Sequence, residues 1–443
     1  MKTSVTYREI WLIAYPIIIG SVAQNLLNIT DTAFLGRVGQ VALGAGAIGG
    51  IFYLVAAMLT WGFGIGSQII IARRNGEQSY AEIGRTFQHG FYFQLPLALA
   101  LFSLMQFFSA DIMKFIIRSE DVYHYTQEYI KYRSYGIFFA SVNMLFNGFY
   151  IGITRTKVIT WATLLMTLVN IVLDYGLIFG NLGLPEMGIG GAALASSIAE
   201  FSGTAFFVVF TLAKMDGKKF NLFQLAKFDE VLYKRMIRVG LPVMLQNCIS
   251  MASWLAFFLF IEKLGERALA VSNIIRSFYV ILMIPMWGFG SATNALVSNL
   301  IGKGRQVEVM ALVMKIIRIC APGVLFIVTL GSVFPVLALK IYTNDPELIR
   351  GSLPALHVVN VAAILLSGAF VFFNAVSGTG KTQVSFVIEL TVLFFYLLVA
   401  YVLAEILRQE VYIVWMTEYI YAILLGGISY FYLKSDKWQK ARV

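Results

Sequence analysis

Charged residues are scarce in this chain of 443 residues. Aspartate, glutamate, lysine and arginine together make up 13% of it, whereas hydrophobic residues make up 59%. Soluble globular proteins carry about 25% charged and about 45–50% apolar residues. A soluble fold could not bury this much apolar surface, so we infer that lipid is the solvent for most of it. The shortage of charge therefore excludes an ordinary soluble protein.

Cysteine and histidine are also rare, with two and three residues. Cys248 and Cys320 lack the spacing of metal ligands and are expected to be small apolar core residues. His89, His124 and His357 fall near the ends of predicted helices, and nothing resembles a hydrolytic triad. We therefore expect neither an enzyme nor a bound cofactor. The net charge of +10 is expected to set the membrane topology and not to bind nucleic acid.

Long apolar runs are abundant, for example Leu95–Phe108, Val324–Lys340 and Phe386–Leu407. Transmembrane barrels alternate apolar and polar residues instead, so the runs favour helices. The predicted fold class is an all-α integral membrane protein. Its twelve transmembrane helices are expected at residues 10–35, 41–72, 87–109, 121–152, 158–180, 188–213, 231–262, 267–300, 309–342, 347–378, 383–408 and 411–433. Most lysines and arginines fall at the termini and in the even-numbered loops, which predicts an inner-membrane protein with both termini in the cytoplasm.

The two halves of the sequence match each other at one constant offset in residue number. Pro16 recurs as Pro242, which defines this repeat offset, and the tetrapeptide Trp61–Gly64 recurs at the same offset as Trp287–Gly290. Six helices per half is an even number, so both copies insert in the same direction, related by a pseudo-two-fold axis along the membrane normal. We expect an N-terminal six-helix lobe over residues 1–213, a cytoplasmic linker over 214–230 and a C-terminal six-helix lobe over 231–443. Such duplication is typical of alternating-access carriers.

Comparing each residue with its equivalent in the other half shows which residues the fold requires in both halves and which occur in one half only. Asp31 corresponds to Phe257, and Asp174 corresponds to Ala400, so the frame tolerates apolar residues at both positions. Carboxylates within the membrane are expensive and usually bind ions, protons or substrate. We interpret both acids as functional, with an interhelical hydrogen bond as the alternative for Asp31 and an interfacial position as the alternative for Asp174.

Polar residues at helical spacing form a stripe on four helices of the first half. The stripes are Gln24, Asn28 and Asp31; Thr167, Asn170 and Asp174; Asn143 and Asn147; and Ser196 and Glu200. If they converge, they line a wet chamber whose hard oxygen ligands suit Na⁺ or a proton. Na⁺ is possible at Asp31, Asn170 and Asp174. For the last two stripes, ordinary interhelical hydrogen bonding is the alternative.

Pro16 can bend the first helix and act as a hinge, although its recurrence at Pro242 also fits a shared structural bend. The roles of four other ionisable residues stay open at this point: Glu200, Arg276, Glu389 and Glu418.

Several segments together resemble the multidrug and toxic compound extrusion (MATE) family over nearly the whole chain. They are Asp31–Gly36 (DTAFLG), the turn Gly152–Lys157, Asn170–Tyr175 (NIVLDY), Gly190–Ser196 (GGAALAS) and Gly240–Pro242. The resemblance implies two lobes around a central cleft that export cationic or amphipathic organic compounds against Na⁺ or H⁺. It also implies a cation site at Asp31, Asn170, Asp174 and Ser196, with serine in place of the more usual threonine. Gln24, Asn143 and Asn147 match positions that line the adjacent drug chamber.

Another branch of that family uses a glutamate in helix 7 and an aspartate in helix 10. This chain has Ser250 in the corresponding part of helix 7 and no aspartate between Val361 and Gly380. It therefore resembles the DinF-like branch more closely.

Two functions remain in competition on the sequence. The first is an antiporter that exports small organic cations in exchange for Na⁺ or H⁺, acting as a monomer in contact with membrane lipid. The second is a flippase for a lipid-linked oligosaccharide, which would need a basic cleft. The obvious intramembrane cations are Lys131, Arg133 and Arg276. A passive channel or a membrane enzyme has little support.

Overall fold

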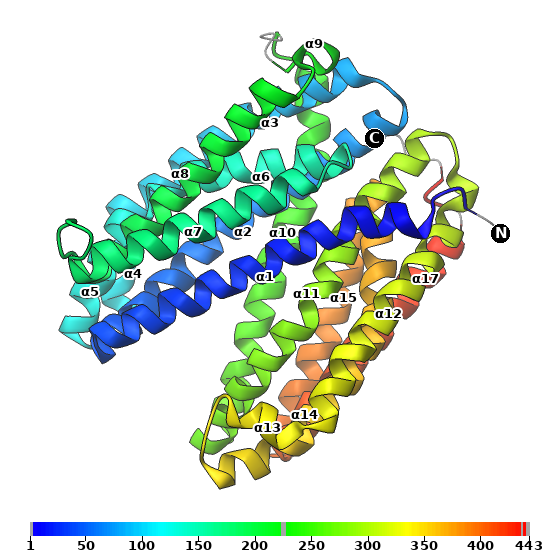
Figure 1. Cartoon of the computed structure of the whole chain (residues 1–443). Coiled ribbons are helices and arrows are strands. Elements are labelled where there is room, and N and C mark those ends of the chain that lie inside the picture. The colour runs from blue at the N-terminus through cyan, green and yellow to red at the C-terminus, as the bar shows by residue number, and fades with distance from the viewer. Residues whose placement is uncertain (1–2, 223–226, 436, 440–443) are drawn as a thin grey trace. The chain divides into compact units, whose positions relative to one another are not determined.

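The computed structural model describes residues 3–222, 227–435 and 437–439, and this part of the chain contains helices and no β-strand (Figure 1). In the first half of the chain the helices are α1 Tyr7–Val38, α2 Gln40–Gly76, α3 Tyr80–Ser103, η1 Leu104–Phe108, α4 Ser109–Ile116, α5 Glu120–Arg133, α6 Gly136–Gly152, α7 Lys157–Phe179, α8 Gly188–Lys214 and α9 Gly217–Phe220. In the second half they are α10 Glu230–Glu262, α11 Glu266–Gly302, η2 Gln306–Glu308, α12 Val309–Val333, α13 Pro335–Lys340, α14 Pro346–Gly378, α15 Thr382–Tyr401, η3 Val402–Ile406, α16 Val411–Trp415 and α17 Thr417–Lys434.

Eleven helical segments of the described chain are long and apolar enough to cross a membrane. The remaining predicted helix, the fourth one at 121–152, is divided into α5 and α6 by a turn at Ser134 and Tyr135. The predicted helix 309–342 is also divided, because Pro335 begins a new helix at its first position. The predicted helix 411–433 is divided as well, into α16 and α17 at Met416. The all-α membrane fold predicted from hydropathy is thus confirmed, with these interruptions.

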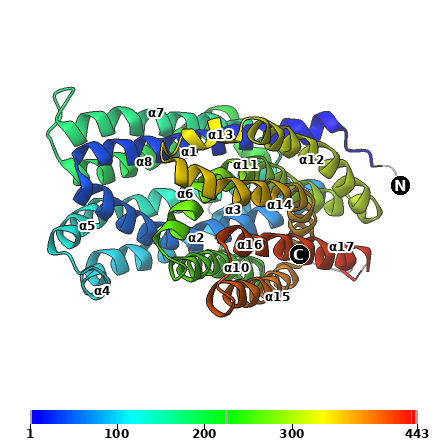
Figure 2. The same ribbon diagram turned by 90° about the horizontal axis from the view of Figure 1, so that it is seen from below.

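Contacts among the helices divide the chain into two compact units. The N-terminal unit is Ile19–Met244, and the C-terminal unit is Leu245–Val443 together with Met1–Ile18. Helices at equivalent places in the repeat pack together within each unit. In the N-terminal unit α6 packs against α2 and α3, and α7 lies beside α8; in the C-terminal unit α14 packs against α11 and α12, and α15 lies beside α17 (Figure 2).

The repeat extends to single contacts inside each unit. A Cβ atom at Gly64 on α2 would meet the backbone oxygen of Met144 at 2.9 Å, and one at Gly290 on α11 would meet the ring of Phe370 at 2.7 Å. Gly290 and Phe370 are the repeat equivalents of Gly64 and Met144. The two halves therefore share packing geometry and not sequence pattern alone.

The chain passes from one unit to the other inside α1, after Ile18, and inside α10, after Met244. These two positions are also repeat equivalents, and each lies two positions beyond the proline of its helix. The units therefore differ from the predicted lobes, 1–213 and 231–443, by the first segments of α1 and α10. Of the predicted linker at 214–230, residues 223–226 lie outside the described part of the chain.

Glycines of the repeated tetrapeptide explain why these first segments pack where they do. A Cβ atom at Gly62 on α2 would lie 2.5 Å from the Cα of Met244, so α10 approaches α2 backbone to backbone. A Cβ atom at Gly288 on α11 would collide with the side chain of Ile18 on α1. Small residues permit this close approach of helices in a membrane. The tetrapeptide thus holds the first segment of α10 in one unit and the first segment of α1 in the other.

Asp229 anchors the start of α10 on α3. Its Oδ1 accepts hydrogen bonds from the backbone N–H groups of Leu232 and Val231, and its Oδ2 accepts one from Arg85 at 2.8 Å. Its own N–H donates to Nε2 of His89 at 2.8 Å. The N–H groups of Leu232 and Val231, with the nearby charge of Arg85, hold the pKa of the Asp229 carboxyl below its usual range.

Candidate functional site

Four polar side chains from α1, α7 and α8 meet inside the N-terminal unit. Asn170 and Asp174 are one turn apart on α7 and are fully buried, Ser196 on α8 is 9% exposed, and Asp31 on α1 is partly buried. Helical spacing puts Asn170 and Asp174 on one face of α7, and this face packs against α8. The structure therefore brings together all four residues predicted to form a cation site.

The Asn170 amide lies between the other three side chains and has two orientations with different partners. With its nitrogen facing the carboxyl groups, it donates to Asp31 Oδ1 at 2.8 Å and to Asp174 Oδ2 at 3.3 Å. In the opposite orientation the nitrogen donates to Ser196 Oγ at 3.3 Å, and the amide oxygen then faces the acids. Because ionised carboxylate oxygens only accept, the orientation with the nitrogen toward the acids is the one that satisfies both ends of the amide.

The two carboxyl groups of the site lie within hydrogen-bonding reach of each other, and Ser196 is within reach of Asp31. A direct hydrogen bond between two carboxyl groups requires one proton, because an ionised carboxylate only accepts. Asp174 Oδ1 is buried and makes no hydrogen bond within the described structure. Two acids, one of which has an oxygen without a hydrogen bond, could together bind a proton or a small cation.

The chemistry of the donor set also limits what can bind. It consists of carboxylate, amide and hydroxyl oxygens, which are hard ligands. The part of the chain that the structure describes contains no group of three or more histidine, cysteine, aspartate or glutamate side chains placed to hold a metal ion. This arrangement suits a monovalent cation or a proton and does not suit a transition metal.

Thr167 links α7 to α1 one turn before Asn170. Its hydroxyl donates to the backbone oxygen of Thr163 at 2.9 Å and is 3.4 Å from the backbone oxygen of Ala23 on α1. A Cβ atom at Gly20 would lie 3.6 Å from the hydroxyl of Thr163. Thr167 therefore helps to hold α1 against α7 close to the acids.

Glu200 on α8 forms a largely buried ion pair with Arg133 at the end of α5. The guanidinium donates two parallel hydrogen bonds, Nη1 to Oε2 at 2.8 Å and Nη2 to Oε1 at 2.6 Å. The Tyr53 hydroxyl also donates to this carboxylate, at 2.9 Å and 3.1 Å, and its ring lies 3.5 Å from the guanidinium carbon. The predicted chamber residue Glu200 is thus neutralised in the structure, and Arg133 is also close enough to Asp31 to interact with its charge.

Gly136 makes room for this ion pair where α6 begins. A Cβ atom there would collide with the Arg133 guanidinium and the Glu200 carboxylate. The turn at Ser134 and Tyr135 ends α5 immediately after Arg133. The interruption of the predicted helix 121–152 therefore coincides with the place where a charged pair is buried between α5, α6 and α8.

The two asparagines predicted on α6 have different environments. Asn143 donates to the backbone oxygen of Glu200 at 2.9 Å and accepts from the Thr204 hydroxyl at 2.9 Å, so it ties α6 to α8. Asn147 is partly buried, and its Oδ1 has no hydrogen-bond partner in the described structure. Asn147 is therefore the better candidate of the two for contact with a ligand.

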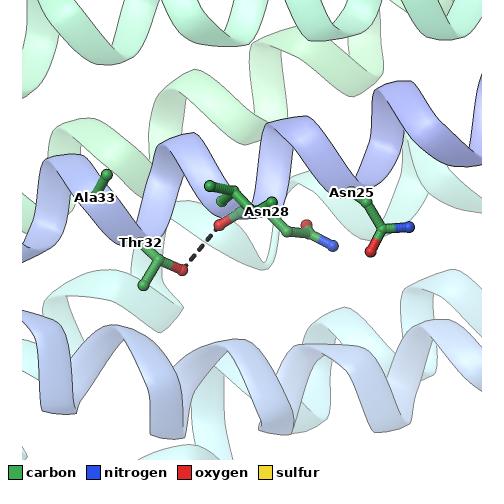
Figure 3. A pocket seen from close by; sticks show the side chains of 5 residues that line it. Asn25, Asn28, Thr32 and Ala33 are labelled. Carbon is green, nitrogen blue, oxygen red and sulfur yellow. Dashed lines mark hydrogen bonds between the residues drawn. The ribbon is translucent and has the colours of Figure 1, made fainter. Parts of the chain in front are cut away.

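Gln24 and Asn28 are exposed on α1. Figure 3 shows an open pocket along this helix, lined by Asn25, Asn28, Ile29, Thr32 and Ala33. Asn25 and Thr32 bond to their own helix, to the backbone oxygens of Ser21 and Asn28. The side chain of Asn28 is thus the predicted chamber residue that lines this pocket.

Sequence reasoning missed the roles of Tyr53, Asn25 and Thr32. The signal for Tyr53 was its recurrence as Tyr279 in the repeat, and the signal for Asn25 and Thr32 was their i, i+7 spacing, which puts both on the pocket side of α1. Arg276 is exposed, and its guanidinium carbon lies 5.3 Å from the centre of the Phe258 ring. Pro16, the predicted hinge, lies inside α1 two positions before the helix changes units.

Comparison with known families gives a match that follows the repeat. A profile of the MatE family matches residues 16–176 and again residues 242–402. The first residues of the two matches are Pro16 and Pro242, and their last residues are Gly176 and Val402, which are also repeat equivalents. The two matches therefore reproduce the repeat offset found in the sequence.

Related sequences and structures cover nearly the whole chain. A probable multidrug resistance protein NorM of Thermotoga maritima is 25% identical over 442 residues, which cover 98% of this chain and 94% of that protein. A multidrug resistance protein NorM of Burkholderia vietnamiensis is 26% identical over 369 residues, 81% of this chain and 76% of that one. A solved outward-facing conformation of a multidrug resistance MATE family transporter of the MOP superfamily has a TM-score of 0.89 at 19% identity, covering 98% of this chain and 97% of that one. A MOP superfamily transporter from Pyrococcus furiosus has a TM-score of 0.87 at 18% identity, with the same coverage. At these identities the structural likeness shows the fold alone.

Proposed function

The chain belongs to the MatE family, and from this premise we propose that it exports cationic or amphipathic organic compounds in exchange for Na⁺ or H⁺. It is a transporter and not an enzyme, and an integral membrane protein. Relatives named as multidrug resistance proteins support small organic molecules as the substrate class. Both termini are proposed to face the cytoplasm, and the working unit is proposed to be a monomer.

The observation that carries the proposal is the pair of acids in the N-terminal unit. Asp31 and Asp174 share one buried site, and Asp174 Oδ1 is without a hydrogen bond in the described structure. When both are ionised, their charge attracts a cationic substrate. A proton or Na⁺ between them cancels part of this charge, and the Asn170 amide can turn its oxygen toward the bound cation. Coupling ion and organic cation then exclude each other through electrostatics.

Alternating access requires only that the two ligands bind differently to two states of the protein. We propose that α1 and α10 bend beside Pro16 and Pro242, where each helix leaves one compact unit and enters the other. A proline lacks the N–H that would bond to the preceding turn, so bending there breaks few hydrogen bonds. Binding at Asp31 would then be transmitted along α1 to the change of units.

The alternative function, flipping of a lipid-linked oligosaccharide, has less support in the geometry. An anionic pyrophosphate head group needs cationic partners. Arg133 is held in its paired hydrogen bonds with Glu200, and Lys131 and Arg276 are exposed. None of the three offers an unpaired buried cation to such a head group.

Dye efflux from proteoliposomes tests the proposal. A Na⁺ gradient at equal pH and a pH gradient at equal Na⁺ are imposed separately on vesicles loaded with ethidium. We expect efflux with one or both gradients, and a fall of about tenfold or more in Asp31→Asn and Asp174→Asn, since each ~1.4 kcal/mol of lost interaction is tenfold in affinity. The matched control is Asp111→Asn, an exposed acid of the same unit. Wild-type efflux in Asp31→Asn would contradict the mechanism.

A further inference from the structure

The C-terminal unit contains two buried glutamates that the proposed N-terminal site does not use. Glu389 on α15 is 3% exposed, and Glu418 on α17 is 2% exposed. Within the part of the chain that the structure describes, the groups that interact with these carboxyls are hydroxyls, with no cationic partner for either. A buried carboxylate without a cation is unfavourable and becomes neutral by binding a proton or an ion. These acids therefore need an explanation of their own.

The two carboxylate oxygens of Glu389 differ in their hydrogen bonds. Its Oε1 accepts hydrogen bonds from Ser250 Oγ at 2.8 Å and from the Tyr421 hydroxyl at 3.0 Å. Its Oε2 is buried and has no hydrogen-bond partner in the described structure. A proton can therefore bind at Oε2 without displacing either donor, because both donors are on the other oxygen.

Glu418 is held by two tyrosines instead. Its Oε2 accepts from the Tyr279 hydroxyl at 2.9 Å, and its Oε1 accepts from the Tyr396 hydroxyl at 3.1 Å. The ring of Tyr396 lies 5.8 Å from the ring of Tyr421, which binds Glu389. The two acids thus belong to one cluster, in which α10, α11, α15 and α17 each contribute a hydroxyl.

Comparison of the repeats shows that the corresponding tyrosine of the N-terminal unit contacts a glutamate that has a cationic partner. Tyr53 and Tyr279 are repeat equivalents, and each donates to a glutamate on the sixth long helix of its half of the chain, α8 or α17. In the N-terminal unit Arg133 neutralises that glutamate. The position equivalent to Arg133 is Val359, which is fully buried. At this position the C-terminal unit thus has an apolar residue where the N-terminal unit has the cation.

The cluster is also distinct from a copy of the N-terminal cation site. The equivalents of Asp31 and Asn170 are Phe257 and Tyr396, whose rings lie 5.5 Å apart. Aromatic packing replaces the acid–amide contact there, and the acids of the C-terminal unit stand at other positions of α15 and α17.

The titratable groups that face the two carboxyls are the three tyrosines already named, from α11, α15 and α17. Helix α14 packs against α15 and α17, and it contributes no interacting acid or base to either carboxyl within the described residues. The elements around the cluster therefore supply hydroxyl donors and no fixed positive charge.

We propose that Glu389 and Glu418 form a second proton-binding site, located in the C-terminal unit, with Oε2 of Glu389 as the atom that takes the proton. The claim that this cluster binds a proton does not depend on the proposed function. The claim that the bound proton contributes to coupling does rest on that function. Proton binding neutralises the Glu389 carboxyl, and proton release leaves on it a charge that the Ser250 and Tyr421 hydroxyls stabilise.

Infrared difference spectroscopy of the protein in liposomes tests this proposal. The background is Asp31→Asn with Asp174→Asn, which removes carboxyl signals from the N-terminal site. We expect the C=O band of a protonated carboxylic acid to appear reversibly as the pH is lowered. The band should be lost in Glu389→Gln, which keeps the acceptor for Ser250 and Tyr421, and should shift in Glu418→Gln.

Controls and outcomes separate this inference from the proposed function. Glu266→Gln, an exposed acid of the same unit, should leave the band unchanged. A band that persists in Glu389→Gln, or one that is present at every pH because the acid is permanently protonated, would overturn the proposal. Displacement of the band by Na⁺ at constant pH would overturn its assignment to a proton. Ethidium efflux is measured on the variants with intact Asp31 and Asp174, so failure of efflux and failure of the band are read independently.

Discussion

The ion pair between Arg133 and Glu200 gives a prediction whose size follows from the structure. Arg133→Met removes the guanidinium, which donates at 2.8 Å and 2.6 Å to a carboxylate whose side chain is 14% exposed. Among the described residues, the Tyr53 hydroxyl is then the side-chain donor that Glu200 keeps. Glu200→Gln leaves the opposite residue, an arginine that stays charged at every accessible pH. Each single change therefore leaves one buried charge without its partner.

Breaking a buried pair by removing one partner destabilises a protein by about 3–5 kcal/mol, whereas replacing both partners with apolar residues is often neutral. We expect a loss in this range for Arg133→Met and for Glu200→Gln. Glu200→Gln keeps the contact of Arg133 with the Tyr53 ring, which is worth about 0.5–2 kcal/mol. We expect the double variant Arg133→Met with Glu200→Leu to lose clearly less than the sum of the single changes.

The assay is the free energy of unfolding in mixed detergent micelles, measured for the wild type, the single variants and the double variant. Additive effects across the double-mutant cycle would refute the reasoning, since they would mean that the two charges do not stabilise each other.

Three further changes are predicted from contacts described above. Gly62→Ala puts a Cβ atom into the backbone of α10 and should destabilise the N-terminal unit by about 1–3 kcal/mol; Gly44→Ala on the same helix, with open space around it, should be neutral or slightly stabilising in the same unfolding assay. Gly136→Ala should separate the buried ion pair and lower the thermal midpoint, whereas Gly36→Ala, also in open space, should not. The lowered pKa of Asp229 stabilises the folded protein above the unfolded pKa of about 3.9, and this stabilisation is lost as the pH falls through the folded pKa. The difference in thermal midpoint between wild type and Asp229→Asn should therefore be present at neutral pH and vanish in strong acid; a constant difference would contradict it.

The helices could be predicted because a membrane leaves the backbone few options. Every N–H and C=O group must be bonded inside its own segment, so a long apolar run implies a helix. Hydropathy did not reveal the turn at Ser134 and Tyr135, because an average over about twenty residues does not resolve a two-residue break. At that break Gly136 leaves room for an ion pair with α8.

The residues of the proposed cation site could be singled out because they carry two signals at once. Asp31, Asn170 and Asp174 have helical spacing, and their equivalents in the second half are not acidic. The same spacing placed Glu200 beside Ser196 but could not show its partner, which lies 67 residues away in sequence. Glu389 and Glu418 also have equivalents in the other half that are not acidic, Thr163 and Ala192, but spacing could not show their partners, which are tyrosines and a serine on other helices.

The sequence by itself determined that this chain is a helical membrane protein made of two equivalent halves, with acids placed unequally between them. Only the tertiary structure decided which acid is paired, which acid is bare, and that α1 and α10 each belong to both units. The physical reason is the range of the interactions. Periodicity and hydropathy depend on which face of a single helix contacts its solvent. The partner of a buried charge depends instead on which helix packs against it and on how far along that helix the partner residue lies.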